Sequence, residues 1–223
     1  YIEEHRAGEV DTLWKPQVTV FEDMRDFVEK GGSAGYVKLP TGSGKTVLFA
    51  EFVEALNLRT LIVVPTKLLV DQTEDKLKKY ASDLEVGVVR TGRKKDFSKQ
   101  CTVITSPSFT SKLRSGEINP AEYDLLILDE AHTALSGLRM SAVNQFKNTL
   151  KIGFTATPDY STKKGVGKLL ETEIHRMSIK EAVVEEGILS GFQSILAKTD
   201  TDLSKVKIVG GDRYDEKELE VAV

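Results

Sequence analysis

The sequence predicts an α/β domain whose central, mainly parallel sheet is covered by helices on both faces. Three observations support this fold class. Short apolar segments alternate along the chain with amphipathic ones, as strands and helices do in such domains. Some of the strand segments, such as TLIVVP at 60–65, carry apolar residues on both faces, as buried parallel strands do. The 223 residues, 40% of them hydrophobic, suffice for one large core.

The expected elements follow one another in a regular order. The first helix is expected over 17–30, where one apolar stripe contains Val20, Phe21, Met24, Phe27 and Val28. The segment 31–35 (GGSAG) should interrupt the regular structure. Further helices are expected from Lys45 onward, over 67–80 and over 178–187, and a polar loop over 157–167. Strands are expected at 36–39, 60–65, 85–90, 101–106, 124–129, 150–156, 172–177 (at an edge of the sheet) and 192–199.

Composition narrows the possible functions. The only cysteine is Cys101, so an intramolecular disulfide is excluded, and with three histidines no zinc cluster is expected. This cysteine usage fits a reducing, cytoplasmic setting. Acidic residues outnumber basic ones by 34 to 31, which argues against a broad basic surface for nucleic acid but not against a narrow track of backbone and hydroxyl contacts.

The hydropathy and the N-terminal sequence predict how the chain relates to membranes and to a longer protein. No apolar run approaches the roughly 18 residues of a membrane helix, so no membrane partner is expected. The charged N-terminal stretch YIEEHRAGEV does not begin with Met and has no apolar core like that of a signal peptide. We therefore expect a piece of a longer protein, in which residues 1–12 form an extension.

A glycine-rich loop lies between the expected strand at 36–39 and the helix that follows it. The stretch 38–46 reads KLPTGSGKT and ends as a phosphate-binding loop does, although the general pattern G-x-x-x-x-G-K-[ST] would place glycine at Leu39. Glycines here allow backbone N–H groups to approach phosphates, and the helix N-terminus adds its dipole. The predicted nucleotide-binding residues are Pro40, Thr41, Gly42, Ser43, Gly44, Lys45 and Thr46. The alternative is a plain turn before a helix.

Two of these loop residues have predicted roles of their own. Lys45 would reach the outer phosphates of the nucleotide, and the Thr46 hydroxyl would hold Mg²⁺.

Two acids follow a buried strand in the stretch 125–132, LLILDEAH. Their position is the carboxyl end of a parallel strand, the edge where α/β sheets bind ligands. Asp129 is predicted to act on the Mg²⁺ shell, and Glu130 to orient and deprotonate a water. The alternative is a pair of acids that merely decorate a helix N-terminus.

Together with FTATP at 154–158, these motifs resemble the first RecA-like domain of a superfamily-two DEAD/DEAH-box helicase or translocase. The family's loop often lacks the first glycine of the general pattern, which accounts for Leu39. The resemblance implies a RecA-like P-loop NTPase fold that binds and hydrolyses ATP with Mg²⁺. It also implies catalytic roles for Lys45, Asp129 and Glu130, and a coupling of the ATP site to nucleic acid through His132, Thr155 and Thr157.

The remaining motifs extend the resemblance along the chain. LWKPQ at 13–17 resembles the family motif whose glutamine, here Gln17, recognises adenine. The stretches 63–72, 90–92 and 103–109 resemble motifs that contact nucleic acid, which implies contacts from Thr66, Thr91, Gly92, Thr105 and Ser106. Without the resemblance, these Ser and Thr residues after strands would be ordinary helix caps, and the basic stretch 92–96 a solvated loop.

GFTATP at 153–158, together with SIKEAVVEEGIL at 178–189 and the stretch 199–212, resembles the restriction-enzyme motor subunits, which implies DNA rather than RNA as the nucleic acid. Residues 1–200 are expected to form the ATP-binding domain and 201–223 a connector to a second RecA-like domain, with nuclease or methyltransferase modules as further partners. Without the arginine fingers of that second domain, the fragment should hydrolyse ATP weakly. Two alternatives are a nucleotide-dependent switch or scaffold that binds nucleic acid without productive hydrolysis, and a small-molecule kinase.

Overall fold

The structure is a computed structural model that describes residues 13–161, 164–191, 208–209 and 213–214. The chain divides into two compact units, Tyr1–Ser190 and Gly191–Val223. In the smaller unit, β10 (Ile208–Val209) and β11 (Arg213–Tyr214) pair antiparallel. The strand expected at 192–199 lies outside the described residues, as does most of the connector expected at 201–223.

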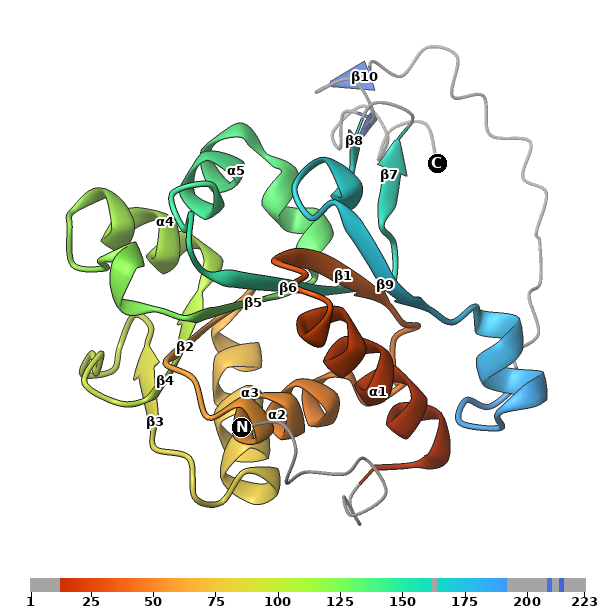
Figure 1. The fold of residues 1–223 in the computed structure, drawn as a ribbon. Coiled ribbons are helices and arrows are strands. Elements are labelled where there is room, and N and C mark those ends of the chain that lie inside the picture. Colours follow the sequence, from red (N-terminus) through yellow and green to blue (C-terminus); the bar gives the residue numbers. More distant parts are fainter. Residues whose placement is uncertain (1–12, 162–163, 192–207, 210–212, 215–223) are drawn as a thin grey trace. The chain divides into compact units, whose positions relative to one another are not determined.

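The larger unit contains a seven-stranded sheet in the order β3-β4-β2-β5-β6-β1-β9 (Figure 1). Every neighbouring pair is parallel, which confirms the predicted fold class. The edge position predicted for the strand near 172–177 is confirmed by β9. The strands are β1 (Ala34–Lys38), β2 (Thr60–Val64), β3 (Val86–Val89), β4 (Cys101–Thr105), β5 (Leu125–Asp129), β6 (Leu150–Thr155) and β9 (Thr172–Arg176).

Helices cover both faces of this sheet, and β2 shows why. All five of its residues are buried, and alternate side chains point to opposite faces. Ile62 and Val64 belong to one core cluster and Leu61 and Val63 to the other. The helices α1 (Lys15–Glu29), α2 (Lys45–Leu56) and α3 (Lys67–Tyr80) lie on one face, and α4 (Ser106–Arg114) and α5 (Gly137–Val143) on the other (Figure 1).

Two helices were not predicted, because each is short and weakly apolar. α4 has nine residues, of which only Phe109 and Leu113 are buried hydrophobic residues, and α5 has seven. Ser106, expected at the end of a strand, instead begins α4, because the Thr105 side chain accepts a hydrogen bond from the Ser108 N–H and caps the helix. Short 3₁₀ turns, η2 (Pro120–Glu122) and η3 (Ala131–Leu135), flank β5.

Three other expectations need correction. Ala34 and Gly35 belong to β1, where a Cβ on Gly35 would come within 2.7 Å of Ile174 on β9, so glycine permits this close strand pairing. The polar loop at 157–167 contains a small hairpin of β7 (Asp159–Ser161) and β8 (Lys164–Gly165), with the 3₁₀ turn η4 at Val166–Lys168.

The helix expected over 178–187 contains a π-helical turn, η5 (Glu181–Glu185). The Ser178 N–H donates to the Glu181 carboxylate at 2.5 Å, and the Glu181 N–H donates to Ser178 Oγ at 3.1 Å, which is a capping box. Gly187, with φ of +64°, follows this turn as expected. None of the helices in the described ranges has the length and apolar character needed to cross a membrane.

Candidate nucleotide site and nucleic-acid interface

The glycine-rich loop has the backbone that its sequence predicts. It joins β1 to α2, and Gly42 and Gly44 adopt φ angles of +88° and +80°, which glycine tolerates far better than other residues. A Cβ on Gly44 would overlap the Gln17 amide nitrogen. Gly44 immediately precedes α2, so the loop and the helix N-terminus together form the kind of cradle that binds phosphates.

Leu39 occupies the position where the general pattern has glycine. Its side chain is buried in the core, and its N–H donates to the Thr155 carbonyl oxygen at 3.0 Å. The chain therefore continues the pairing of β1 with β6 through this residue. A glycine is unnecessary at a position that extends a strand.

Gln17, predicted to contact adenine, lies against the phosphate-binding loop. The Gln17 side chain is buried, and its amide nitrogen donates to the Ser43 carbonyl oxygen at 3.0 Å. Its amide oxygen accepts from the Trp14 N–H at 2.9 Å. Gln17 thus joins the start of α1 to the loop, and its contact with adenine stays a prediction.

The acidic end of β5 meets the loop through an ion pair. Lys45 Nζ lies 3.1 Å from Glu130 Oε1, and the Lys45 side chain is only 10% exposed. Glu130 has a left-handed backbone with φ of +48°, and its N–H donates to Asp129 Oδ1 at 3.0 Å. The three residues predicted to be catalytic therefore lie together, at the carboxyl ends of parallel strands.

Asp129 carries a carboxyl group in an environment that disfavours its charge. Burial, together with the neighbouring Glu130 carboxylate, raises the pKa of Asp129 to about 6, and Lys45 only partly offsets this. A cation at this position would relieve both effects. The Asp129 carboxylate and the half-buried Thr46 hydroxyl are hard oxygen ligands of the kind that Mg²⁺ prefers, so the residues present fit that ion.

Without nucleotide or metal, Asp129→Asn should stabilise the domain at pH 7.5. A raised carboxyl pKa means that the folded state binds more protons, so stability falls as pH rises from about 4 through 6. Asparagine keeps the acceptor for the Glu130 N–H and removes the buried charge. The gain is at most about 3 kcal/mol, which is a rise in Tm of several degrees that shrinks towards pH 4.

Thermal unfolding in a chelator, at a series of pH values, measures this effect. Asp83→Asn removes a charge from an exposed position and serves as the control. A Tm for Asp129→Asn equal to or below that of the unsubstituted protein at pH 7.5 would contradict the prediction.

The three residues predicted to couple the sites are in contact. His132 Nδ1, on η3, lies 2.9 Å from Thr155 Oγ1 at the end of β6. The Thr157 hydroxyl lies 3.5 Å from the same nitrogen, and the Thr157 N–H donates to Thr155 Oγ1 at 3.1 Å. Because His132 Nδ1 is also 3.4 Å from Glu130 Oε2, the cluster joins the acidic end of β5 to the segment after β6.

The residues predicted to contact nucleic acid fall into two groups. Thr66 is exposed at the start of α3, where it caps the helix by accepting from the Leu69 N–H, and Thr91 is also exposed. Thr105 and Ser106 are buried, and the Ser106 hydroxyl donates to the Val64 carbonyl oxygen at 3.3 Å. The structure therefore gives Thr66, Thr105 and Ser106 roles within the domain.

A pocket of about 450 Å³ joins the turn at Thr91–Gly92 to the start of α4. Its other polar lining residues include Ser108, Ser111 and Lys112, which were not predicted. Their spacing of i, i+3 and i+4 places them on one helix face, a signal that could have been recognised had α4 been predicted. Hydroxyls and cations gathered around a backbone turn are suited to contacts with phosphates.

The fold and this site define the first RecA-like domain of a superfamily-two helicase. Its loop, its acidic strand end and its His–Thr cluster lie along β1, β5 and β6 of one parallel sheet. A family model described as "Type III restriction enzyme, res subunit" matches residues 11–160, and the chain belongs to this family. The predicted resemblance to restriction-enzyme motor subunits is thereby confirmed.

Individual relatives agree with this assignment. The DNA 3'-5' translocase XPB2 of Sulfurisphaera tokodaii is 33% identical over 156 residues, which cover 67% of this chain and 34% of the relative. The putative ATP-dependent helicase IRC3 of Saccharomyces cerevisiae is 28% identical over 193 residues, which cover 79% of this chain and 28% of the relative. The chain thus matches about a third of each relative's length.

Solved structures share the fold. A nuclease-deletion mutant of the type ISP restriction-modification enzyme LlaGI, in complex with a DNA substrate mimic, matches with a TM-score of 0.61 at 23% identity. The match covers 78% of this chain and 18% of that one. The SWI2/SNF2 ATPase core of Sulfolobus solfataricus, in complex with dsDNA, matches with a TM-score of 0.59 at 22% identity, over 72% of this chain and 36% of that one.

Proposed function

We propose that this chain is the ATP-binding and ATP-hydrolysing motor domain of a DEAH-type helicase or nucleic-acid translocase that acts on DNA. The observation that carries the proposal is the contact of 3.1 Å between Lys45 and Glu130. One residue belongs to the phosphate-binding loop and the other to the end of β5. The contact therefore places the cation that would meet the outer phosphates beside the carboxylate that would activate water.

The contact between Lys45 and Glu130 also provides a mechanism by which nucleotide binding prepares this chain's residues for hydrolysis. Phosphate oxygens compete with Glu130 for the Lys45 ammonium, so nucleotide binding frees the Glu130 carboxylate to accept a proton from water. The hydrogen bond from the Glu130 N–H to Asp129 keeps the backbone in place during this exchange. Mg²⁺, held by Thr46 and Asp129 when bound, neutralises phosphate charge. A change at Glu130 reaches Thr155 and Thr157 through His132.

The comparisons favour DNA as the nucleic acid. One relative is named a DNA translocase, and two solved structures with this fold are complexes with DNA or a DNA mimic. The pocket beside Thr91 and Gly92 offers backbone and hydroxyl groups suited to the phosphates of either nucleic acid, without reading its sequence. We further propose that residues 1–200 work with a second RecA-like domain reached through 201–223, that nuclease or methyltransferase modules are further partners, and that the setting is cytoplasmic.

The test measures nucleotide binding and phosphate release by residues 1–223, with and without DNA or RNA strands. We expect Mg²⁺–ATP to raise the Tm, because a ligand that binds only the folded state stabilises it. We expect slow phosphate release, because arginine fingers of the proposed second domain are worth about 10³–10⁵ in rate.

Each other outcome contradicts a defined part of the proposal. The absence of ATP binding contradicts it as a whole. Fast, DNA-stimulated turnover by residues 1–223 contradicts the need for a second domain. A phosphorylated acceptor among the products, in place of free phosphate, would indicate a kinase.

A further inference from the structure

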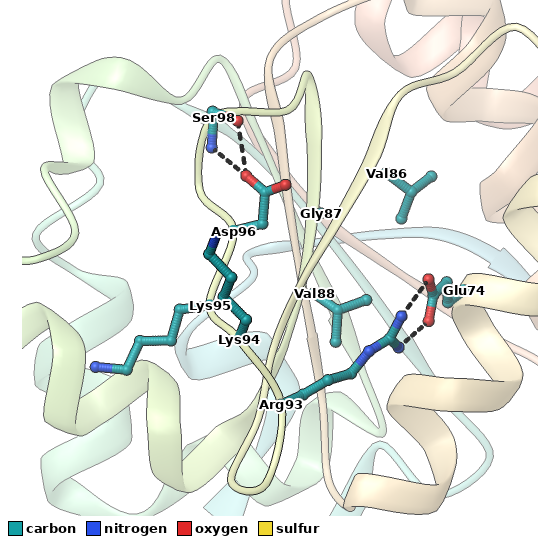
Figure 2. Close-up of a pocket in the computed structure, with 9 residues that line it drawn as sticks. All are labelled: Glu74, Val86, Gly87, Val88, Arg93, Lys94, Lys95, Asp96 and Ser98. Carbon is teal, nitrogen blue, oxygen red and sulfur yellow. Dashed lines mark hydrogen bonds and ion pairs between the residues drawn. The ribbon is translucent and has the colours of Figure 1, made fainter.

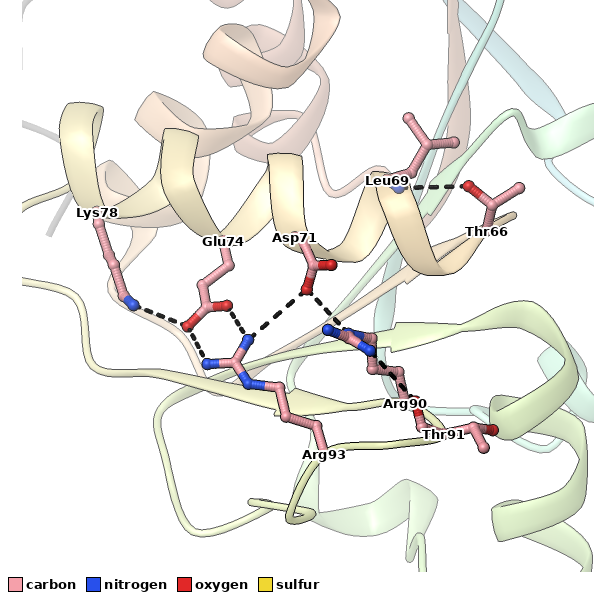
Figure 3. Close-up of polar contacts among 8 residues, drawn as sticks. All are labelled: Thr66, Leu69, Asp71, Glu74, Lys78, Arg90, Thr91 and Arg93. Atoms are coloured by element: carbon pink, nitrogen blue, oxygen red, sulfur yellow. Dashed lines mark hydrogen bonds and ion pairs between the residues drawn. The ribbon is translucent and has the colours of Figure 1, made fainter.

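The turn that follows β3 is tied to α3 by two arginines (Figure 3). Arg90 Nε donates to Asp71 Oδ1 at 2.9 Å. The Arg93 guanidinium donates to both carboxylate oxygens of Glu74, and it also lies 3.7 Å from Asp71. The helix that Thr66 caps therefore holds the turn that contains Thr91.

Arg90 makes a second contact, with the turn itself. Its Nη1 donates to the Thr91 carbonyl oxygen at 3.2 Å, so one guanidinium bridges α3 and the Thr91–Gly92 peptide group (Figure 3). In a planar trans peptide the C=O and the following N–H point in opposite directions. The Gly92 N–H is therefore directed away from Arg90. Gly92 has φ of +86°, a conformation that glycine adopts readily.

We propose that Asp71 and Arg90 are positioning residues for nucleic-acid binding: they fix the Thr91–Gly92 peptide so that the Gly92 N–H faces a backbone phosphate. This inference rests on the proposed function, because it assigns a task to residues behind the same interface. The pocket beside this turn is the place where the phosphate would lie. Asp71 does not contact the nucleic acid itself. It holds Arg90, which in turn holds the Thr91 carbonyl, so this acidic residue promotes the binding of a phosphate.

The Glu74–Arg93 pair has a different task, as the burial of Glu74 shows. The Glu74 side chain is 7% exposed, whereas that of Asp71 is 41% exposed. The bonds from Arg93 hold the pKa of Glu74 below its usual value, although burial opposes this. Arg93 and Glu74 also line a pocket of about 460 Å³ beside β3 (Figure 2). The buried Glu74 carboxylate, held by Arg93, anchors the loop, whereas the more exposed Asp71 can be replaced with little effect on stability.

Substitution of Asp71 separates positioning from bulk charge. Asp71→Asn removes a negative charge, so an effect of charge alone would tighten the binding of a nucleic-acid strand. Positioning predicts the opposite: binding of a fluorescein-labelled oligothymidylate should weaken about three- to tenfold, the worth of one hydrogen bond. Asp75→Asn is the matched control, because it removes the same charge from an exposed position on α3 and should not weaken binding.

Substitution of Arg90 tests whether this cation touches phosphate directly. Arg90→Gln should weaken binding while leaving the slope of log affinity against log salt unchanged, because positioning releases no counterion. A slope whose magnitude falls by about one would overturn the inference, because it would assign a direct phosphate contact to Arg90.

The result with the unsubstituted chain separates the two proposals. If it binds neither oligothymidylate nor the matching uridine strand, the proposed nucleic-acid function and this inference both fail. If it binds a strand and Asp71→Asn binds equally or more tightly, only this inference is overturned.

Discussion

Replacing Lys45 with alanine should weaken nucleotide binding about 10- to 100-fold while leaving the fold intact. A hydrogen bond to a charged group is worth about 1.5–3 kcal/mol, and Lys45 would make such bonds to the outer phosphates. The Lys45 side chain, only 10% exposed, is also the ion-pair partner of Glu130 in the loop. Alanine at position 45 therefore leaves the Glu130 carboxylate without that partner. Phosphate-rich ligands would then meet a site with an uncompensated negative charge.

Titration with a fluorescent ATP analogue measures this loss, and circular dichroism checks the fold. Lys30→Ala is the matched control, because it removes a lysine that directly follows α1, is 77% exposed and is paired with Asp26. Equal affinities of Lys45→Ala and the unsubstituted chain would count against a nucleotide site in the loop. Lys45→Arg adds a finer test, since it retains the charge but changes its shape.

Glu130→Gln should separate nucleotide binding from hydrolysis. Glutamine preserves the size of the side chain and can still accept a hydrogen bond from Lys45, but it cannot take a proton from water. We expect nucleotide affinity to be unchanged or higher, since the carboxylate no longer competes for Lys45. The rate of phosphate release should fall by roughly 10²–10⁴, the usual contribution of a general base.

Single-turnover release of labelled phosphate measures this rate even where turnover is slow. Glu85→Gln, at a carboxylate that is 68% exposed and paired with Lys99, controls for the loss of one charge. A motor domain should accumulate bound ATP when Glu130 is replaced. If the substitution changes neither binding nor hydrolysis, the domain is better described as a switch or scaffold without productive hydrolysis.

Contiguous motifs allowed much of the nucleotide site to be predicted from the sequence. The loop at 40–46 and the acids after β5 are each a single stretch of chain in a strand-to-turn frame, and the parallel sheet brings the ends of its strands to one edge. The buried strands were predictable for a related reason, since they carry apolar residues on both faces. Local patterns therefore sufficed wherever one short segment carried all the information.

Contacts between distant segments could not be predicted in this way. Lys45 and Glu130 are 85 residues apart, and Asp71 and Arg90 are 19 apart, so no local spacing indicates that either pair forms. The hydroxyl of Ser106 shows the converse problem. The family resemblance implied that Ser106 contacts nucleic acid, but its side chain turns inward to Val64 on β2. Only the packing of neighbouring strands decides that direction.

The loop beside β3 has a consequence for the behaviour of the domain in solution. β3 is an edge strand, and an uncovered edge is a template on which another chain can add a strand and aggregate. Here the Asp96 N–H donates to the Val88 carbonyl oxygen at 3.3 Å, and a Cβ on Gly87 would overlap the Asp96 carbonyl. The segment at Asp96 thus covers the edge of β3. Shortening the loop that contains it would expose this edge to pairing with strands of other chains, and so promote aggregation.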